Sequence, residues 1–218
     1  MSGERVDSRS STQPVLCEWI RVSPRRTAMV VGLEQPLTAM QASRRLGTDP
    51  HATSFLFWEL AARGVTACVN PSATTNRLHW LTEVGLTCRD RIRSGLSLPP
   101  LPQRLPDVPW SLYAELLFRH RSAVVLALTE PMRPSHIRRR AMLRDGGLRM
   151  SANNTRDVVR FLVENKVAQP VPVDRQLHPW YELTELGARC RQLLTSSTTQ
   201  TGATPKADQR DIPWRYET

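Results

Sequence analysis

In the first hundred residues, short segments with periodic apolar positions are bounded by residues that typically cap or end helices. Ser23-Pro24 and Asp49-Pro50 each pair a capping side chain with a proline, which is typical of a helix start. Gly47 and Gly64 are placed where helices usually stop. The pattern predicts helices over about 24–33, 38–46 and 51–63, then strands at 65–69 and 77–82 joined by the turn-rich "NPSATTN".

The same order of elements returns later in the chain. The predicted helices cover about 122–128, 135–143 and 152–165, and the predicted strands cover 167–173 and 180–183. A closing helix follows each hairpin, over about 83–92 and 185–194. The sequence therefore predicts two similar domains rather than one.

A repeated motif supports this division. Leu-Thr-Glu-x-Gly-x-x-Cys-Arg occurs at 81–89 and again at 183–191, a shift of 102 residues. Upstream the shift becomes 95, where "AMVVGLEQPLTAMQASRR" aligns with "AVVLALTEPMRPSHIRRR", and the difference of seven is an insertion near "LRDGGLR". Self-similarity of this kind indicates an internal duplication.

The order helix, short helix, helix, hairpin is that of a winged helix-turn-helix. In addition, "YELTELG" at 181–187 resembles the "Y-x-L-T-x-x-G" segment that commonly follows the wing strand in MarR- and ArsR-type regulators, and His79 replaces the Tyr in the first copy. The resemblance covers roughly 24–92 and 122–194. It implies a mainly α fold with small β-hairpins (α+β), built as two tandem winged helix-turn-helix domains that bind DNA.

The remaining segments complete the expected organisation. Five prolines in 94–109 predict a semi-stiff linker. Helical periodicity at 14–22 and 110–121 predicts a leader helix before each copy, serving either dimerisation or extra core cover. The expected divisions are a disordered tail (1–13), winged-helix domain 1 (14–93), the linker (94–109), winged-helix domain 2 (110–194) and a second disordered tail (195–218).

Charge narrows the class of partner. The net charge is +10 and the pI about 10.6, which favours nucleic acid first and an anionic membrane surface second. No run approaches the ~20 apolar residues of a membrane span, and "MSGERVDSRSSTQ" lacks the apolar stretch of a signal peptide. We expect a cytoplasmic, nucleoid-associated protein without a membrane partner.

The third helix of each copy is where the resemblance places DNA contacts, because this helix enters the major groove in the fold. From the 3.6-residue period, its outward positions in the first copy are Ala52, Ser54, Phe55 and Trp58. The equivalent positions in the second copy are Asn154, Arg156, Asp157 and Arg160. We therefore expect the second copy to bind DNA and the first to bind protein through Phe55 and Trp58.

Arginine and amide side chains suit guanine, adenine and phosphate. The preceding helix and the wing of the second copy supply further arginines, and the first copy offers weaker phosphate contacts of its own. The predicted DNA-binding residues are Arg138, Arg139, Arg140, Asn153, Asn154, Thr155, Arg156, Arg160 and Arg175 in the second copy, with Arg44, Arg45 and Arg77 in the first.

The sequence gives little support for an enzymatic, metal-binding or cofactor-dependent function. The four cysteines are dispersed without metal spacing, which argues against a zinc site and against a disulfide framework. Cys88 and Cys190, at the same motif position, are expected to be small buried hydrophobic residues rather than redox-sensing thiols. No phosphate loop, nucleophile elbow or zinc-protease motif occurs, so we expect no enzyme, no cofactor and no metal.

The preferred hypothesis is a sequence-specific regulator of transcription that binds double-stranded DNA. A homodimer or a protein partner would bind through domain 1. Two other functions of paired winged domains stay open: a non-catalytic assembly subunit of a chromosome condensation-type complex, and a plasmid-type replication initiator.

Overall fold

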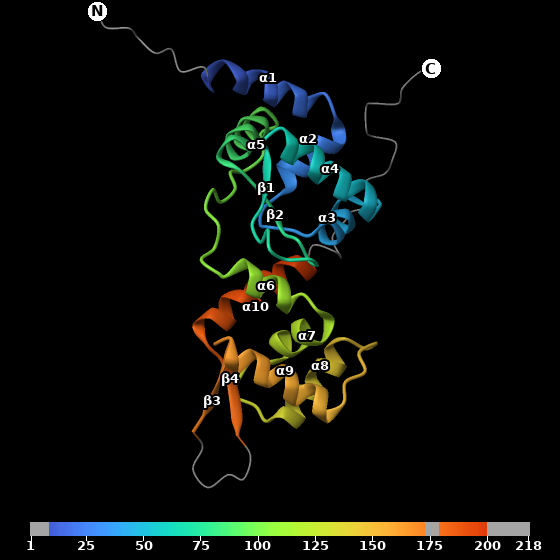
Figure 1. Cartoon of the computed structure of the whole chain (residues 1–218), viewed down its shortest axis with the longest axis vertical. Coiled ribbons are helices and arrows are strands. Elements are labelled where there is room, and N and C mark those ends of the chain that lie inside the picture. Colours follow the sequence, from blue (N-terminus) through green and yellow to red (C-terminus); the bar gives the residue numbers. More distant parts are fainter. Residues whose placement is uncertain (1–8, 173–178, 200–218) are drawn as a thin grey trace, which may run out of the picture. The chain divides into compact units, whose positions relative to one another are not determined.

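The computed structural model of the chain describes residues 9–172 and 179–199. The chain divides into two compact units, unit 1 (Met1–Glu115) and unit 2 (Leu116–Thr218), whose elements are labelled in Figure 1. Most of the described residues are helical, with two antiparallel two-stranded sheets, which confirms the mainly α, α+β class. Over the described ranges, none of the helices combines the length and the apolar character needed to cross a membrane.

Helices of unit 1 begin where the sequence places capping side chains. Ser23 Oγ accepts a hydrogen bond from the backbone N–H of Arg26, and Asp49 Oδ1 accepts one from His51 at 2.8 Å. Gly47 ends α3 at φ +63°, a left-handed conformation that favours glycine. The elements are α1 (Arg9–Arg21), α2 (Pro24–Gly32), α3 (Ala39–Leu46), α4 (Pro50–Ala62), β1 (Thr66–Cys68), β2 (His79–Leu81) and α5 (Glu83–Gly95).

Unit 2 has the same order of elements after α6 (Trp110–Leu116), the helix that spans the boundary between the units. Ser151 Oγ accepts from the backbone N–H of Asn154 at 3.1 Å and so caps the third helix of the unit. The elements are α7 (Arg119–Ala127), α8 (Pro134–Arg144), α9 (Ala152–Glu164), β3 (Ala168–Val171), β4 (Trp180–Leu183) and α10 (Glu185–Thr199).

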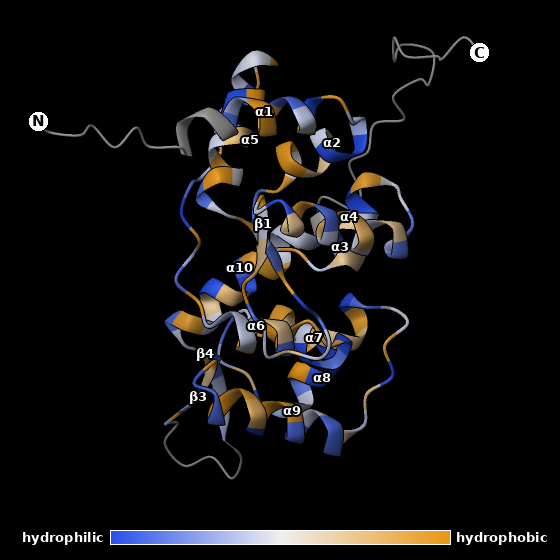
Figure 2. Ribbon diagram, turned by 45° about the horizontal axis from the view of Figure 1, so that its top comes forward, coloured by the Kyte–Doolittle hydropathy of each residue, from blue (hydrophilic) through white to orange (hydrophobic). Residues whose placement is uncertain are grey.

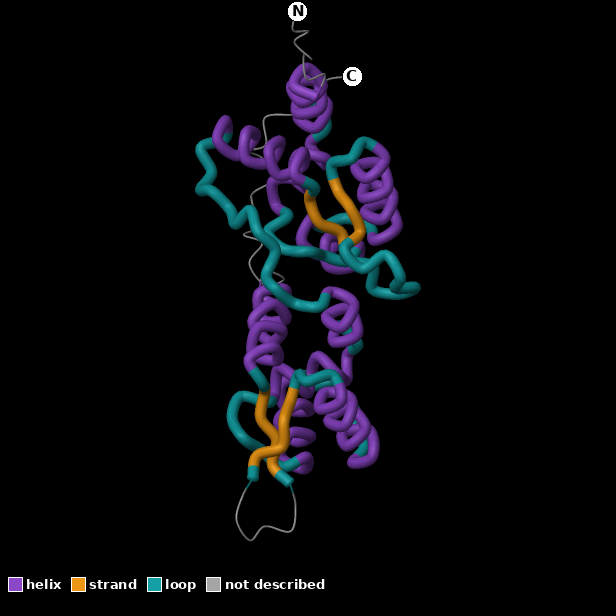
Figure 3. The backbone as a smooth tube through the Cα atoms, turned by 60° about the vertical axis from the view of Figure 1, so that its left-hand side comes forward, coloured by secondary structure: helices purple, strands orange, loops and turns teal. Residues whose placement is uncertain are grey.

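The second strand of each hairpin also pairs with a residue just before a helix, α3 in unit 1 and α8 in unit 2. Leu37 and His79 exchange two backbone hydrogen bonds of 3.2 and 2.9 Å in unit 1. Met132 and Tyr181 exchange two of 2.9 Å in unit 2. In Figure 3 the two strands of each hairpin run side by side within their own unit.

Each unit has an apolar core of its own. In Figure 2 hydrophobic and hydrophilic residues alternate along the helices of both units. The core of unit 1 is formed by α1, α2, α4, α5 and the hairpin, with Ile20, Phe57, Leu60 and Cys88 among its buried residues. Buried residues of unit 2 include Val124, Ile137, Leu162 and Cys190.

The repeated motif has a structural role in unit 1. Thr82 Oγ1 donates to the carbonyl of Gly64 at 2.6 Å and accepts from the backbone N–H of Gly85 at 3.1 Å, so it both caps α5 and binds the end of the preceding segment. A Cβ atom at Gly85 would lie 2.1 Å from the carbonyl oxygen of Val65. Glycine is therefore required for α5 to approach the hairpin this closely.

The motif makes the same contacts in unit 2. Thr184 Oγ1 donates to the carbonyl of Lys166 at 2.6 Å and accepts from the backbone N–H of Gly187 at 3.2 Å. A Cβ atom at Gly187 would lie 2.0 Å from the carbonyl oxygen of Val167. The closing helix of both units is thus held to its hairpin by identical means.

The arginine of the motif also has equivalent contacts. Arg89 Nη1 donates to the carbonyl of Leu33 at 3.5 Å, and Arg191 Nη1 donates to the carbonyl of Leu128 at 3.0 Å. Leu33 and Leu128 lie just after the last residue of α2 and of α7, respectively, where helix carbonyls lack intrahelical donors. The motif therefore joins three elements in each unit, and its recurrence reflects one structural requirement met twice.

The prediction of a single leader helix over 110–121 is wrong in one respect. The chain turns at Leu117 and Phe118, and two helices, α6 and α7, replace the single one. Neither glycine nor proline marks the break. It is decided by packing, because α7 must turn to contact α8, α9 and α10.

Two segments expected to be disordered are partly helical. α1 begins at Arg9 rather than near residue 14, and α10 extends to Thr199. In α10 the hydroxyls of Thr195, Ser196 and Ser197 donate to carbonyls four residues earlier at 2.9–3.0 Å, which satisfies these polar side chains within the helix. The rest of both tails lies outside the described residues.

The proline-rich segment 94–109 is held against unit 1 rather than standing free. Arg93 Nη2 donates to the carbonyl of Pro99 at 2.6 Å, and Arg89 Nη2 donates to that of Pro102 at 3.1 Å. Val108 is 6% exposed, and Leu105 packs against the core. Proline lacks a backbone donor but keeps its carbonyl, so these two arginines can hold the segment in place.

Candidate nucleic-acid interface

α9 has one apolar face and one polar face. Its buried residues are Thr155, Val158, Val159 and Leu162. Asn153, Arg156 and Arg160 are exposed on the other side, at the spacing of successive turns. The helical register expected from the sequence is the register observed.

Thr155 is an exception among the predicted DNA-binding residues. Its side chain is 1% exposed, and its hydroxyl donates to the carbonyl of Ser151 at 2.9 Å. The prediction that it contacts DNA is wrong, because Thr155 falls on the same stripe as Val158 and Val159 and faces the core. Asn154, beside it, is half-buried.

Both arginines of α9 make only exposed contacts. Arg156 Nη1 donates to Asn153 Oδ1 at 3.0 Å. Arg160 lies 3.3 Å from Asp157 Oδ1, with the two side chains 67% and 65% exposed. Such surface pairs contribute about 0–1 kcal/mol, so either guanidinium can exchange its partner for a phosphate or a base edge at low cost.

α8 adds three consecutive arginines that differ in exposure. Arg138 is half-buried, while Arg139 and Arg140 are exposed. Arg140 Nη2 donates to Glu130 Oε1 at 2.7 Å, so part of its charge is already compensated. In Figure 2, α8 and several turns of α9 carry the hydrophilic colour.

Two further exposed arginines were missed by the sequence reasoning. Arg144 ends α8, and Arg149 lies in the turn between α8 and α9. The signal was present, because the seven-residue insertion near "LRDGGLR" that distinguishes the second copy contains both. The turn is held by Arg119, whose Nε and Nη2 donate to Asp145 at 2.8 and 2.7 Å and lower the pKa of that carboxyl.

Arg175, predicted to contact DNA from the wing, lies outside the described residues. The described part of this hairpin pairs Ala168 with Leu183 and Val171 with Trp180. These and the two pairs between them are the base of the β3–β4 hairpin.

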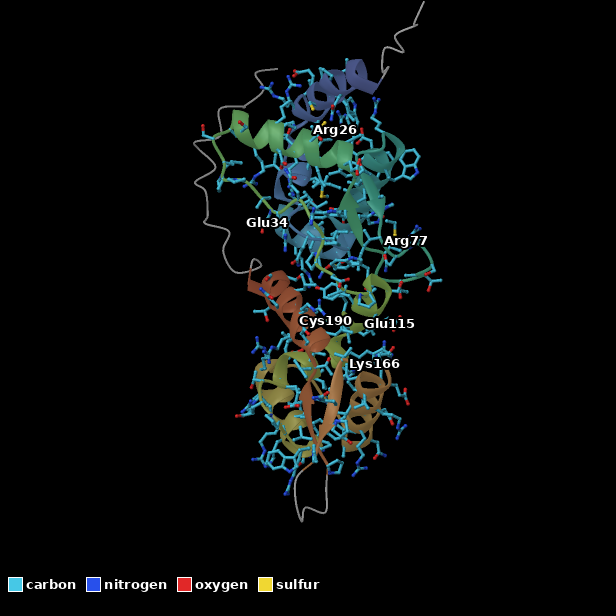
Figure 4. The ribbon with its side chains drawn as sticks, turned by 90° about the vertical axis from the view of Figure 1, so that its left-hand side faces the viewer. Arg26, Glu34, Arg77, Glu115, Lys166 and Cys190 are labelled. Atoms are coloured by element: carbon cyan, nitrogen blue, oxygen red, sulfur yellow. The ribbon has the colours of Figure 1, made fainter. Side chains whose placement is uncertain are left out.

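The three predicted contacts of unit 1 come from two places. Arg44 is exposed at the end of α3, and its neighbour Arg45 is half-buried, so that burial lowers the pKa of Arg45. Arg77 is exposed in the connection between β1 and β2, where Figure 4 labels it. They do not lie on α4, the helix equivalent to α9.

α4 exposes aromatic rings instead. The side chains of Phe55 and Trp58 are 61% and 64% exposed, and their ring centroids lie 5.5 Å apart. An open groove of about 400 Å³ includes Phe55 in its lining, and a second of about 490 Å³ includes Trp58 and the exposed Met40. Exposed rings of this kind are typical of a protein contact. Arginines also line both grooves, Arg25 and Arg26 in the first and Arg77 in the second.

The net charge also differs between α3 and α4 of unit 1 and the equivalent helices α8 and α9 of unit 2. Ala39–Ala62, which contains α3 and α4, has two arginines and two acidic residues, a balance of zero. Pro134–Glu164, which contains α8 and α9, has seven arginines and three acidic residues, a balance of +4. This helix pair of unit 2 therefore carries +4 of the chain's net charge of +10, whereas α3 and α4 carry none.

Among the described residues, no group of three or more His, Cys, Asp or Glu side chains is placed to hold a metal ion. Cys88 and Cys190 are fully buried, as expected from the motif. Comparison with protein-family models, with curated proteins and with solved structures found no match.

Proposed function

We propose that this chain is a sequence-specific DNA-binding regulator of transcription, built from two winged helix-turn-helix units that arose by internal duplication. The observation that carries the proposal is the exposed face of α9, where Asn153, Arg156 and Arg160 follow one another along a helix without acidic compensation beyond Asp157. The equal element order and the equivalent motif contacts of the two units support the duplication.

In this proposal α9 enters the major groove of double-stranded DNA. Arg156 and Arg160 bind guanine edges or phosphates, and Asn153 binds an adenine edge or a phosphate near the start of the helix. Arg139, Arg144 and Arg149 on α8 and the following turn bind the flanking phosphates, which fixes the register of the helix on the duplex.

Unit 1 contributes protein contacts. Phe55 and Trp58 occupy the positions equivalent to Asp157 and Arg160, and their rings bind a second copy of the chain or another protein. A homodimer formed through unit 1 would place two copies of unit 2 on two half-sites, so its target would be palindromic.

The same aromatic pair favours a second candidate function, a non-catalytic subunit of a chromosome condensation-type assembly. That function uses winged domains to bind protein and needs no base-reading helix. The charge of α8 and α9 favours the regulator. A plasmid-type replication initiator differs from the regulator only in binding repeated sites near an origin.

Recovery of genomic DNA tests the proposal. The purified chain is mixed with sheared DNA from its host at about 0.15 M salt, and the DNA that remains bound is sequenced. The double variant Arg156→Ala/Arg160→Ala is run in parallel. A matched control, Arg25→Ala/Arg91→Ala, removes the same charge from exposed positions of unit 1.

Sharp peaks that persist in the control and disappear in the α9 variant are the expected result, and their position separates promoters from origins. Uniform recovery that both double variants reduce equally would mean binding by charge alone. The regulator hypothesis would then be abandoned in favour of the assembly subunit.

A further inference from the structure

Two cysteines that are distant in sequence meet in the core of unit 1. The Sγ atoms of Cys17 on α1 and Cys88 on α5 lie 2.7 Å apart. The two side chains are only 4% and 0% exposed. This separation is shorter than two unbonded sulfur atoms normally keep and approaches a sulfur–sulfur bond, which is about 2.0 Å long.

Unit 2 shows that the motif alone does not explain this pairing. Cys190 occupies the motif position equivalent to Cys88 and is equally buried, and Figure 4 places it on α10. α6, which precedes unit 2, contains no cysteine. A requirement for a small buried residue accounts for Cys190 and Cys88, but it does not account for a second thiol placed against Cys88.

We propose that Cys17 and Cys88 are a modification site, at which oxidation forms an intramolecular disulfide that fastens α1 to α5. The chain has two other cysteines, Cys68 on β1 and Cys190 in unit 2, and neither is paired with another cysteine by a described contact. The proposal is independent of DNA binding by unit 2.

A peroxide is the oxidant that we assign to the reaction. The Cys17 thiolate attacks a peroxide oxygen, the O–O bond breaks, and hydroxide leaves to give a sulfenic acid. Cys88 Sγ then attacks the Cys17 sulfur, the S–O bond breaks, and the hydroxyl takes up the Cys88 proton and leaves as water. Two thiols and one hydrogen peroxide thus yield one disulfide and two waters.

Burial makes Cys17 the first to react. It lies on α1, the helix at the edge of the unit, and retains slight exposure, whereas Cys88 has none. Burial and the neighbouring thiol raise the pKa of Cys88 to about 12, so Cys88 is a neutral thiol at physiological pH. Oxidation is therefore slow while α1 is packed, and local opening of α1 exposes Cys17 to peroxide.

The cross-link would affect more than the two sulfurs. Trp19 on α1 packs between the guanidinium groups of Arg26 and Arg63, at 4.0 and 4.3 Å from its ring centroid. Arg63 is the C-cap of α4, the helix that exposes the aromatic pair. A disulfide at Cys17 thus fixes the helix that contacts the end of α4.

Peptide mapping tests the site directly. The full chain is treated with excess hydrogen peroxide, remaining thiols are alkylated under denaturing conditions, and the protein is digested with trypsin without reductant. Cleavage after arginine places Cys17 in peptide 10–21 and Cys88 in peptide 78–89. The expected product is these two peptides joined, and a reductant separates them.

Variants define the controls. Cys190→Ala should keep the linked peptides, and Cys17→Ala should abolish them. Since alanine tolerates burial, neither change should prevent folding. Oxidation of the wild type should also raise the midpoint of thermal unfolding by about 5 °C or more, because the bond closes a long loop. Cys17→Ala should show no such shift.

The proposal would be overturned by either of two results. In the first, Cys17 and Cys88 are both recovered as alkylated thiols after peroxide treatment that oxidises exposed methionine. In the second, Cys17 is recovered linked to Cys68, to Cys190 or to another chain more often than to Cys88.

Discussion

α4 and α9 hold the same position in their units and expose opposite chemistry. α4 exposes Phe55 and Trp58, whereas α9 exposes Asp157 and Arg160 at the equivalent positions. Within each unit, however, the motif holds the closing helix by the same contacts, including the threonine hydroxyl that caps this helix. Packing constrains the inner positions wherever the same arrangement of elements occurs twice, and the outer positions are free to acquire different partners.

The largest expected effect is a loss of folding stability, which tests whether the closing helices of the two units are equivalent. Gly85→Ala and Gly187→Ala each place a Cβ within 2.1 Å of a backbone carbonyl oxygen. Each should lower the free energy of unfolding by roughly 3 kcal/mol or more, since neither neighbouring backbone can move without breaking the hairpin. Denaturant titration measures the loss. Gly95→Ala, which meets no atom within 4 Å, is the control.

If only one of the two glycine variants is destabilised, the equivalence of the two units is superficial. Equal losses in the free energy of unfolding would show that the closing helix contributes equally to the stability of both units.

A second effect tests the proposed division of labour. Arg156→Ala and Arg160→Ala should each weaken binding to the recovered DNA by about 1–3 kcal/mol, or roughly fivefold to 150-fold in Kd, if they contact bases. Fluorescence anisotropy at fixed salt measures the change. Arg25→Ala should change Kd far less, and a loss as large as that of Arg156→Ala would place the interface elsewhere.

A smaller effect is expected when the surface of α4 is exchanged for that of α9. The variant Phe55→Asp/Trp58→Arg removes both exposed rings and should abolish self-association of the chain or binding of its protein partner. DNA affinity and stability should stay within about 0.5 kcal/mol, since these side chains support no core contact. Sedimentation and anisotropy measure the two properties. Loss of DNA binding without a change in mass would contradict the proposed roles.

The smallest effect concerns pH and applies to both units. Burial raises the pKa of Cys88 to about 12 and of Cys190 to about 11. A thiol whose pKa is raised by folding stabilises the fold fully below its unfolded value of 9.0, and this stability is lost as pH rises above that value. We expect a loss of about 1.4 kcal/mol per thiol near pH 10, where the unfolded thiol is mostly ionised and the folded thiol is not.

Thermal unfolding in the presence of a reductant, at about pH 8 and pH 10, measures this loss. The double variant Cys88→Ala/Cys190→Ala should show a shallower decline than the wild type. An identical decline would assign the alkaline effect to other groups.

Local signals in the sequence were sufficient for most of the fold. Ser23, Thr38, Asp49 and Ser151 begin helices because a capping hydroxyl or carboxylate acts within three residues of its own position. The exposed face of α9 was also predictable from a local signal, because side chains on one face of a helix recur every 3.6 residues. The error at Thr155 shows the limit of this reasoning, because a polar residue within the apolar stripe is buried with it.

What the sequence determined by itself was therefore local: the order of elements, the helix starts, the repeated motif and the polarity of each helix face. Only the tertiary structure decided the break between α6 and α7, the docking of 94–109 by Arg89 and Arg93, and the meeting of Cys17 with Cys88. These features depend on contacts between residues that are far apart or on competition among packed surfaces. Cys17 and Cys88 lie 71 positions apart, so no local pattern contains both. The carbonyls that Arg93 and Arg89 bind lie only 6 and 13 residues away, but a backbone carbonyl leaves no side-chain signal in the sequence.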